Sequence, residues 1–143
     1  MNKRIYNQAL KEKRLVKFPG GPKLVKNELV MAKKDLKTAR KSLKKKDYKW
    51  AIVQGYYASF HTARALVYSR KIKEKTHYHL VMAVKVLFVD EYLLAEELLM
   101  ELREAMGLRE KADYEAEYSV KGAKYVISVA EDFIEAAARI LND

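Results

Sequence analysis

Tyrosine, histidine and arginine side chains recur at helical spacing between residues 57 and 64. Tyr57, His61 and Arg64 are separated by four and three residues, so in a helix they lie on one face. An imidazole moves protons near neutral pH, and a guanidinium holds a phosphate through a bidentate fork. The three residues are therefore a candidate phosphate- or nucleotide-binding site. The alternative interpretation is that His61 is a hydrogen-bonded histidine in the interior or at an interface.

The other two histidines, His77 and His79, follow a good helix N-cap, Thr76. His77 is expected in the first turn of that helix, where it can hydrogen-bond a neighbouring helix or line a pocket. The two histidines are too close in a helix to share a metal ion easily, and no carboxylate completes a ligand set. There is no cysteine, no glycine-rich phosphate loop and no Ser/His/Asp order. Neither a metal nor a cofactor is expected.

The charge is unevenly distributed along the 143 residues, whose formal net charge is +10. The first 49 residues contain 17 Lys and Arg against four Asp and Glu. This imbalance favours an anionic partner, either nucleic acid or an acidic protein. The alternative is a solvated helix face whose charges serve solubility.

The positions of the apolar residues predict helices, because they recur at steps of three and four. The seam Val120, Ala123, Ile127, Ala130 and Ile134 is the most regular. The pattern predicts helices over residues 3–14, 24–46, 48–70, 77–89, 92–112 and 119–141.

Short connections between these helices predict an all-α, up-and-down antiparallel bundle of four to five helices. Asp47, Thr76 and Ser119 are the expected N-caps. The Pro/Gly cluster at residues 18–22 divides the chain into a basic N-terminal extension, 1–23, and the bundle, 24–143.

Composition narrows the cellular setting. No apolar run resembles a signal peptide or a membrane span, so a cytoplasmic protein without membrane contact is expected. Lys and Glu are abundant while Asn, Gln and Cys are scarce, which is typical of thermophile proteins.

Three segments, in this order, carry a resemblance to a known family. They are the run from Asp47 to Leu66 with its Tyr56-Tyr57 pair and Ala-Arg-Ala-Leu end, then Lys75-Thr76-His77, then Arg109 to Tyr114. Over about residues 26–141 the chain resembles a prokaryotic family of HEPN-domain proteins. The resemblance implies a helical bundle that is usually a homodimer. It also implies a frequent association with a nucleotidyltransferase-like partner protein, as toxin and antitoxin.

In active HEPN toxins, the resemblance further implies a metal-independent ribonuclease with an Arg, four to six residues, then a His. The matching position here begins at Arg109, but Tyr114 stands where the His is expected, and no His follows His79. A phenol with an ordinary pKa near 10 is a poor base at neutral pH. Arg109, Asp113 and Tyr114 are therefore the candidate catalytic residues of a degenerate motif.

Two other histidines bear on that motif. Arg70 and His77 also match its spacing, but they span a turn between two helices, and we interpret this match as coincidence. His61 can in principle replace the missing histidine if the fold joins it to Arg109.

Three functions remain open. The first is a HEPN-fold protein that binds RNA, a nucleotide or a nucleotidyltransferase-like partner and has a degenerate nuclease motif. The second is an active ribonuclease toxin with a variant site. The third is a non-catalytic dimerising helical module.

Overall fold

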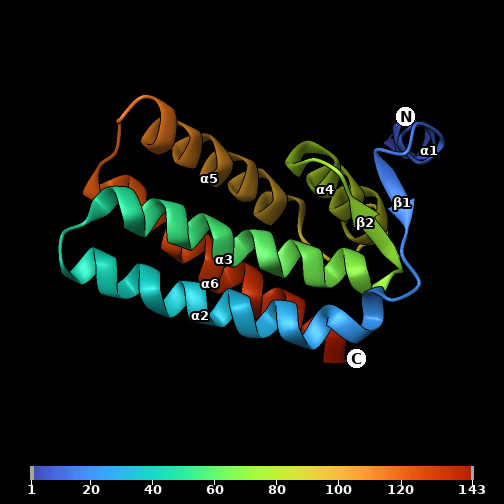
Figure 1. The fold of residues 1–143 in the computed structure, drawn as a ribbon, viewed down its shortest axis with the longest axis horizontal. Helices are drawn as coiled ribbons and strands as arrows, with labels where there is room; N and C mark the ends of the chain where they lie inside the picture. Colours follow the sequence, from blue (N-terminus) through green and yellow to red (C-terminus); the bar gives the residue numbers. More distant parts are fainter. Residues whose placement is uncertain (1, 143) are drawn as a thin grey trace.

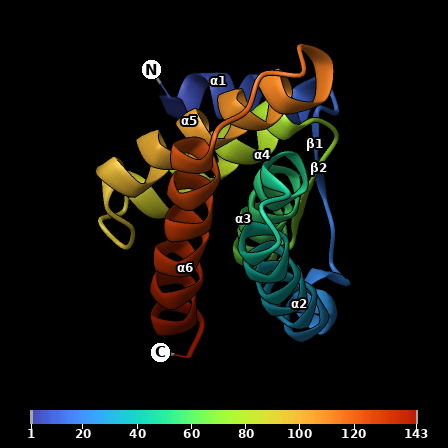
Figure 2. The ribbon, with the colours of Figure 1, turned by 90° about the vertical axis from the view of Figure 1, so that its left-hand side faces the viewer.

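Four long helices form the body of the molecule (Figure 1). The computed structural model describes residues 2–142. Helix α3 lies at the centre and contacts each of the other three. Figure 2, an end-on view, shows α2 and α3 on one side of the bundle and α6 on the other. The four helices are α2 (Val25–Lys44), α3 (Tyr48–Ser69), α5 (Glu96–Tyr114) and α6 (Val120–Asn142).

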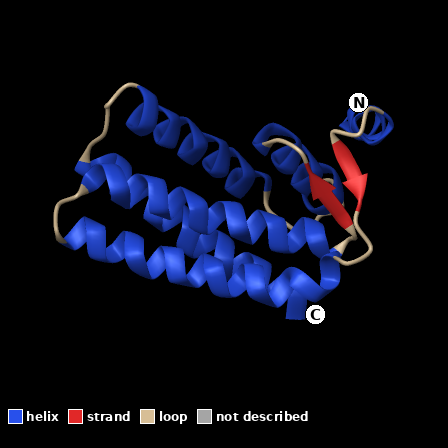
Figure 3. Ribbon diagram, viewed as in Figure 1, coloured by secondary structure: helices blue, strands red, loops and turns tan. Residues whose placement is uncertain are grey.

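Smaller elements cover one end of this body. A two-stranded antiparallel sheet joins the N-terminal segment to the chain after α3, with Leu15 opposite Glu74 and Lys17 opposite Ile72 (Figure 3). The remaining short helices lie beside it or lead into the bundle. These elements are α1 (Asn2–Lys11), β1 (Leu15–Lys17), η1 (Gly21–Leu24), β2 (Ile72–Glu74), α4 (His77–Val84) and the π-helix η2 (Lys85–Val89).

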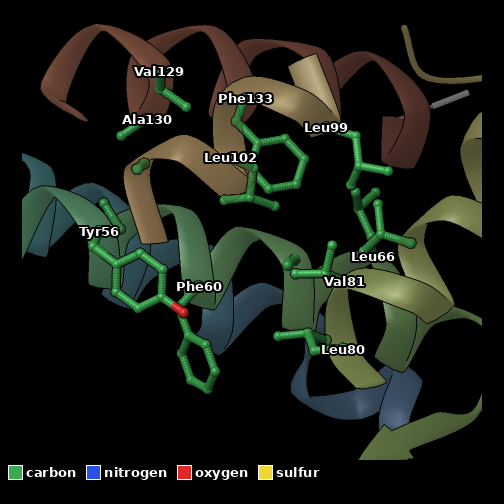
Figure 4. Packing of buried hydrophobic residues seen from close by; sticks show 14 of the residues in the cluster. Tyr56, Phe60, Leu66, Leu80, Val81, Leu99, Leu102, Val129, Ala130 and Phe133 are labelled. Atoms are coloured by element: carbon green, nitrogen blue, oxygen red, sulfur yellow. The ribbon is translucent and has the colours of Figure 1, made fainter. Parts of the chain in front are cut away.

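One apolar core runs through the molecule. Phe133 of α6, Leu99 and Leu102 of α5 and Leu66 of α3 are almost fully buried in it (Figure 4). Tyr6, Ala9 and Leu15 from the N-terminal segment belong to the same cluster, and Leu15 has no exposed surface. The N-terminal segment therefore contributes to the core of the bundle.

The structure confirms the predicted all-α antiparallel bundle, and it differs at several boundaries. The two three-residue strands were not predicted, because strands so short show no alternation. The helix expected from residue 92 begins at Glu96, since Tyr92 has a positive φ of 61° that stops a helix there. The helix expected over 77–89 changes to a π-helix at Lys85.

The three predicted N-cap residues differ in whether their side chains make a capping hydrogen bond. Thr76 accepts a hydrogen bond from the His79 amide at 3.1 Å, and Ser119 accepts one from the Gly122 amide at 2.9 Å. Asp47 occupies the predicted N-cap position of α3, but its side chain makes no capping hydrogen bond. None of the helices within residues 2–142 combines the length and apolar character that crossing a bilayer requires.

Candidate phosphate-binding site

Arg109, on α5, faces the tyrosine pair of α3. Its Nη2 donates a hydrogen bond to the Tyr57 hydroxyl at 3.2 Å, and its guanidinium carbon lies 5.4 Å from the Tyr56 ring centre. Its Nε lies 3.1 Å from a carboxylate oxygen of Asp113, one turn along α5. That Nε is buried but not aligned for a hydrogen bond within the described chain, so the Asp113 contact is electrostatic. These contacts hold the guanidinium in one position.

His77, at the start of α4, joins the same cluster through Tyr56. The Tyr56 hydroxyl and Nδ1 of His77 are 2.7 Å apart, and the two rings stack with centres 5.8 Å apart. Thr76 caps this helix, which fixes where His77 leaves the backbone. Three helices thus bring Arg109, Tyr57, Tyr56 and His77 together.

The shifted pKa values leave Arg109 charged while Tyr56 and His77 are neutral. Burial raises the pKa of Tyr56, so its phenol stays protonated. Burial also lowers the pKa of His77, and the nearby Arg109 charge lowers it further, which leaves a neutral imidazole at pH 7. For Arg109, burial opposes the charge, but Tyr57 and Asp113 outweigh it and raise the pKa. A fixed cation beside a neutral imidazole can bind a phosphate and accept a proton.

His61 belongs to a second polar cluster, between α3 and α2. Its Nδ1 lies 2.6 Å from a carboxylate oxygen of Glu28, and its Nε2 lies 3.6 Å from Asp35. Glu28 is buried. Burial raises the pKa of Asp35, while His61 opposes that shift. Both ring nitrogens of His61 are directed to carboxylates of α2, and no contact with Arg109 is present within residues 2–142.

Arg64 extends this second cluster to β2. Its Nε donates to Glu74 at 2.8 Å, and its Nη1 lies 4.0 Å from Glu28. Glu74 is buried, and its other carboxylate oxygen has no hydrogen-bond partner in the described chain. Burial opposes the charge of Arg64, but the bond to Glu74 prevails and raises its pKa. These contacts tie α3, α2 and the N-terminal sheet together.

The predicted site residues therefore fall into three places. Tyr57 and His77 lie with Arg109 and Asp113, whereas His61 and Arg64 lie in the second cluster. Tyr114 ends α5 with 77% of its surface exposed. Within the described residues, no three His, Asp or Glu side chains are arranged to hold a metal ion.

Sequence reasoning missed Tyr56, Glu28 and Glu74. One signal was present for Glu28: it precedes Ala32 by four residues and so lies on the apolar face of α2. A carboxylate on such a face needs a buried cationic or hydrogen-bonding partner, which His61 and Arg64 supply. Nothing comparable marked Glu74, whose burial depends on the sheet.

The sequence matches a known family model. The model of the HEPN domain matches residues 26–141, which is most of the chain. The chain belongs to the HEPN domain family. The matched range includes both polar clusters and excludes the whole N-terminal segment that contains β1.

Two similar proteins come from Methanocaldococcus jannaschii. One, named "Putative toxin MJ0605", is 28% identical over 114 residues, which are 79% of this chain and 85% of the relative. The other, named "Putative toxin MJ0142", is 28% identical over 116 residues, which are 77% of this chain and 76% of the relative. Both alignments thus span most of each protein.

Proposed function

We propose that this HEPN protein is a toxin-like protein that binds the phosphate of RNA or a nucleotide at Arg109 and has an incomplete nuclease motif. The relatives with toxin names support the first part. The observation that carries the second is the Arg109 guanidinium, held by Tyr57 and Asp113 beside a neutral His77. A positioned, charged guanidinium is suited to a phosphate because it loses little freedom on binding.

The incomplete motif follows from the end of α5. Tyr114 occupies the position of the motif histidine, is largely exposed, and makes no hydrogen bond within the described chain. Tyr114 supplies a phenol where the motif has an imidazole, and imidazole is the side chain suited to proton transfer near neutral pH. The proposed protein therefore keeps the arginine and lacks its usual proton carrier.

The test compares wild type with Arg109→Ala, using labelled RNA in EDTA. We expect no cleavage by either protein, and we expect RNA binding to weaken about tenfold or more in the variant, because a charge-assisted contact is lost. Arg139→Ala is the matched control. Arg139 also pairs with an acid one turn away, Glu135, but it lies on the exposed surface of α6. Equal weakening in both variants would contradict the proposal.

A specific observation favours an active ribonuclease as the second candidate. His77 is neutral, accessible in part, and linked to Tyr56, whose ring also contacts Arg109. If Nδ1 accepts from the phenol, the imidazole carries its proton on Nε2. Cleavage by wild type that is lost in both Arg109→Ala and His77→Ala would support this candidate in place of the first.

The proposal includes assembly as a homodimer and binding of a nucleotidyltransferase-like protein. Exposed aromatic side chains at the end of α5 and in the following turn support it: Tyr114 is 77% exposed and Tyr118 49%. Exposed apolar surface next to a site commonly marks an interface. Light scattering of the purified chain measures the oligomeric state, and a monomer at micromolar concentration would exclude the homodimer.

A further inference from the structure

Helix α2 presents one row of lysines to solvent. Lys34, Lys37 and Lys41 follow each other at steps of three and four, so they share a face, and each is exposed. Lys26, Lys33 and Lys44 are exposed beside this row. We name these six residues the α2 lysine row. At 1.5 Å per residue they extend over about 27 Å.

The acidic residues of α2 do not neutralise this row. The helix contains two, Glu28 and Asp35, and both are directed toward His61 on α3. The helix also contains Arg40, whose charge is compensated by Glu131 of α6. No ion pair of the six lysines is present within residues 2–142. The carboxylates of α2 therefore face His61 of α3, whereas the six ammonium groups lie on the exposed side of the helix.

The row leads to an exposed tryptophan. Lys44 ends α2, a short turn of Lys45, Lys46 and Asp47 follows, and Trp50 lies in the first turn of α3. Trp50 has 47% of its surface exposed, and the Lys49 ammonium lies 5.2 Å from its ring centre. A basic track that ends at an exposed aromatic ring is the combination that binds single-stranded nucleic acid.

We propose that the α2 lysine row binds the phosphate backbone of single-stranded RNA and that Trp50 stacks on one of its bases. The choice of RNA as ligand rests on the proposed function, whereas the surface is distinct from the Arg109 site. A protein partner fits this surface less well, because protein interfaces are depleted in lysine and have an apolar centre. Val30 is the one large apolar side chain exposed on α2. Lysine contacts of this kind bind without regard to base sequence.

The experiment measures binding of a fluorescein-labelled 15-nucleotide uridine RNA by anisotropy at several salt concentrations. The variant is Lys34→Gln/Lys37→Gln/Lys41→Gln. The matched control is Lys11→Gln/Lys13→Gln/Lys75→Gln, which removes three exposed lysines and the same net charge at the end of the molecule that carries α1 and β2 (Figure 1). Each lost phosphate contact lowers the slope of log K against log salt by about 0.7.

We expect the α2 variant to bind about tenfold more weakly at low salt, with a slope reduced by roughly 2, and the control to resemble wild type. Equal weakening in the two variants would reduce the effect to net charge and overturn the proposal. So would unchanged RNA binding in the α2 variant, or competition by poly-L-glutamate as effective as unlabelled RNA, which would indicate an acidic protein.

A second measurement tests the stacking. Trp50 is the one tryptophan of the chain, so its fluorescence reports this position alone. We expect uridine RNA to quench it in wild type and in Arg109→Ala at saturating RNA. Binding without quenching would overturn the role of Trp50. If Arg109→Ala binds RNA like wild type while the α2 variant does not, the Arg109 proposal fails and the lysine-row proposal stands. If the α2 variant binds like wild type while Arg109→Ala does not, the lysine-row proposal fails and the Arg109 proposal stands.

Discussion

Single residues decide which polar groups this bundle can bury. Glu74 is a carboxylate inside an apolar environment, and its charge is offset mainly by Arg64. Burial of an ion is costly unless a partner compensates it. The sequence alone placed Arg64 in a ligand site, because a helical wheel shows the face of a residue but not the strand that packs against it. The position of Arg64 is thus set by β2, which periodicity could not predict.

The first prediction concerns Arg64→Met. The change leaves Glu74 buried without its cation, so we expect the free energy of unfolding to fall by roughly 3 kcal/mol. Urea unfolding measures it. Arg139→Ala serves as control, since its exposed ion pair should contribute under about 1 kcal/mol. The double variant Arg64→Met/Glu74→Gln should recover part of the loss, and failure to recover any would show that packing rather than charge dominates.

The second prediction concerns the pH dependence of stability. Because the pKa of His77 is lowered in the folded protein, the unfolded chain binds more protons, and acid favours unfolding. The loss begins as pH falls below about 6.5, the ordinary value, and stops below the folded pKa. His77→Gln should therefore show a smaller drop in urea midpoint between pH 7.5 and 5.5 than wild type.

Burial also lowers the pKa of His79, so His79 destabilises the folded protein in acid in the same way. For this reason the urea midpoint of His77→Gln should still fall somewhat between pH 7.5 and 5.5. The double variant His77→Gln/His79→Gln should reduce it further. A drop of unchanged size in His77→Gln would show that His77 is not held neutral by the fold.

At the scale of elements, periodicity worked where a helix buries one regular stripe. The predicted spans 24–46, 48–70 and 119–141 differ from α2, α3 and α6 by no more than two residues at either end. It failed where local backbone geometry governs, as at Tyr92 and at the π-turn after Lys85. Such features depend on the packing of α4 and α5, which a single sequence does not display.

The third prediction concerns two glycines, at which substitution by alanine should change stability in opposite directions. Gly107 lies inside α5, and a Cβ there meets nothing within 4 Å, so Gly107→Ala should stabilise by about 0.5–1 kcal/mol. At Gly21 a Cβ would lie 2.4 Å from the Tyr68 carbonyl oxygen, so Gly21→Ala should destabilise. Thermal unfolding measures both. A stabilised Gly21→Ala would mean that η1 does not pack on the end of α3.

At the scale of the whole molecule, the N-terminal segment pairs with a strand, β2, that lies far from it in the sequence. The Pro/Gly cluster predicted an extension outside the bundle, because such residues commonly end a domain. In the structure the cluster forms the turn and η1 between β1 and α2, and β1 pairs with β2. The HEPN match begins at residue 26, so β1 lies outside the matched range while its partner β2 lies within it.

The fourth prediction is that a chain beginning at Leu24 loses substantial stability. Deletion removes the fully buried Leu15 together with Tyr6 and Ala9, and it leaves β2 without its pairing strand. Loss of one buried leucine alone costs about 2–5 kcal/mol when it is truncated to alanine. We therefore expect a lower urea midpoint for the deletion, and Leu15→Ala in the full chain should show a part of the same loss. If both variants unfold at the wild-type midpoint, residues 1–23 are an independent extension, and the charge of Glu74 is held by Arg64 without help from the sheet.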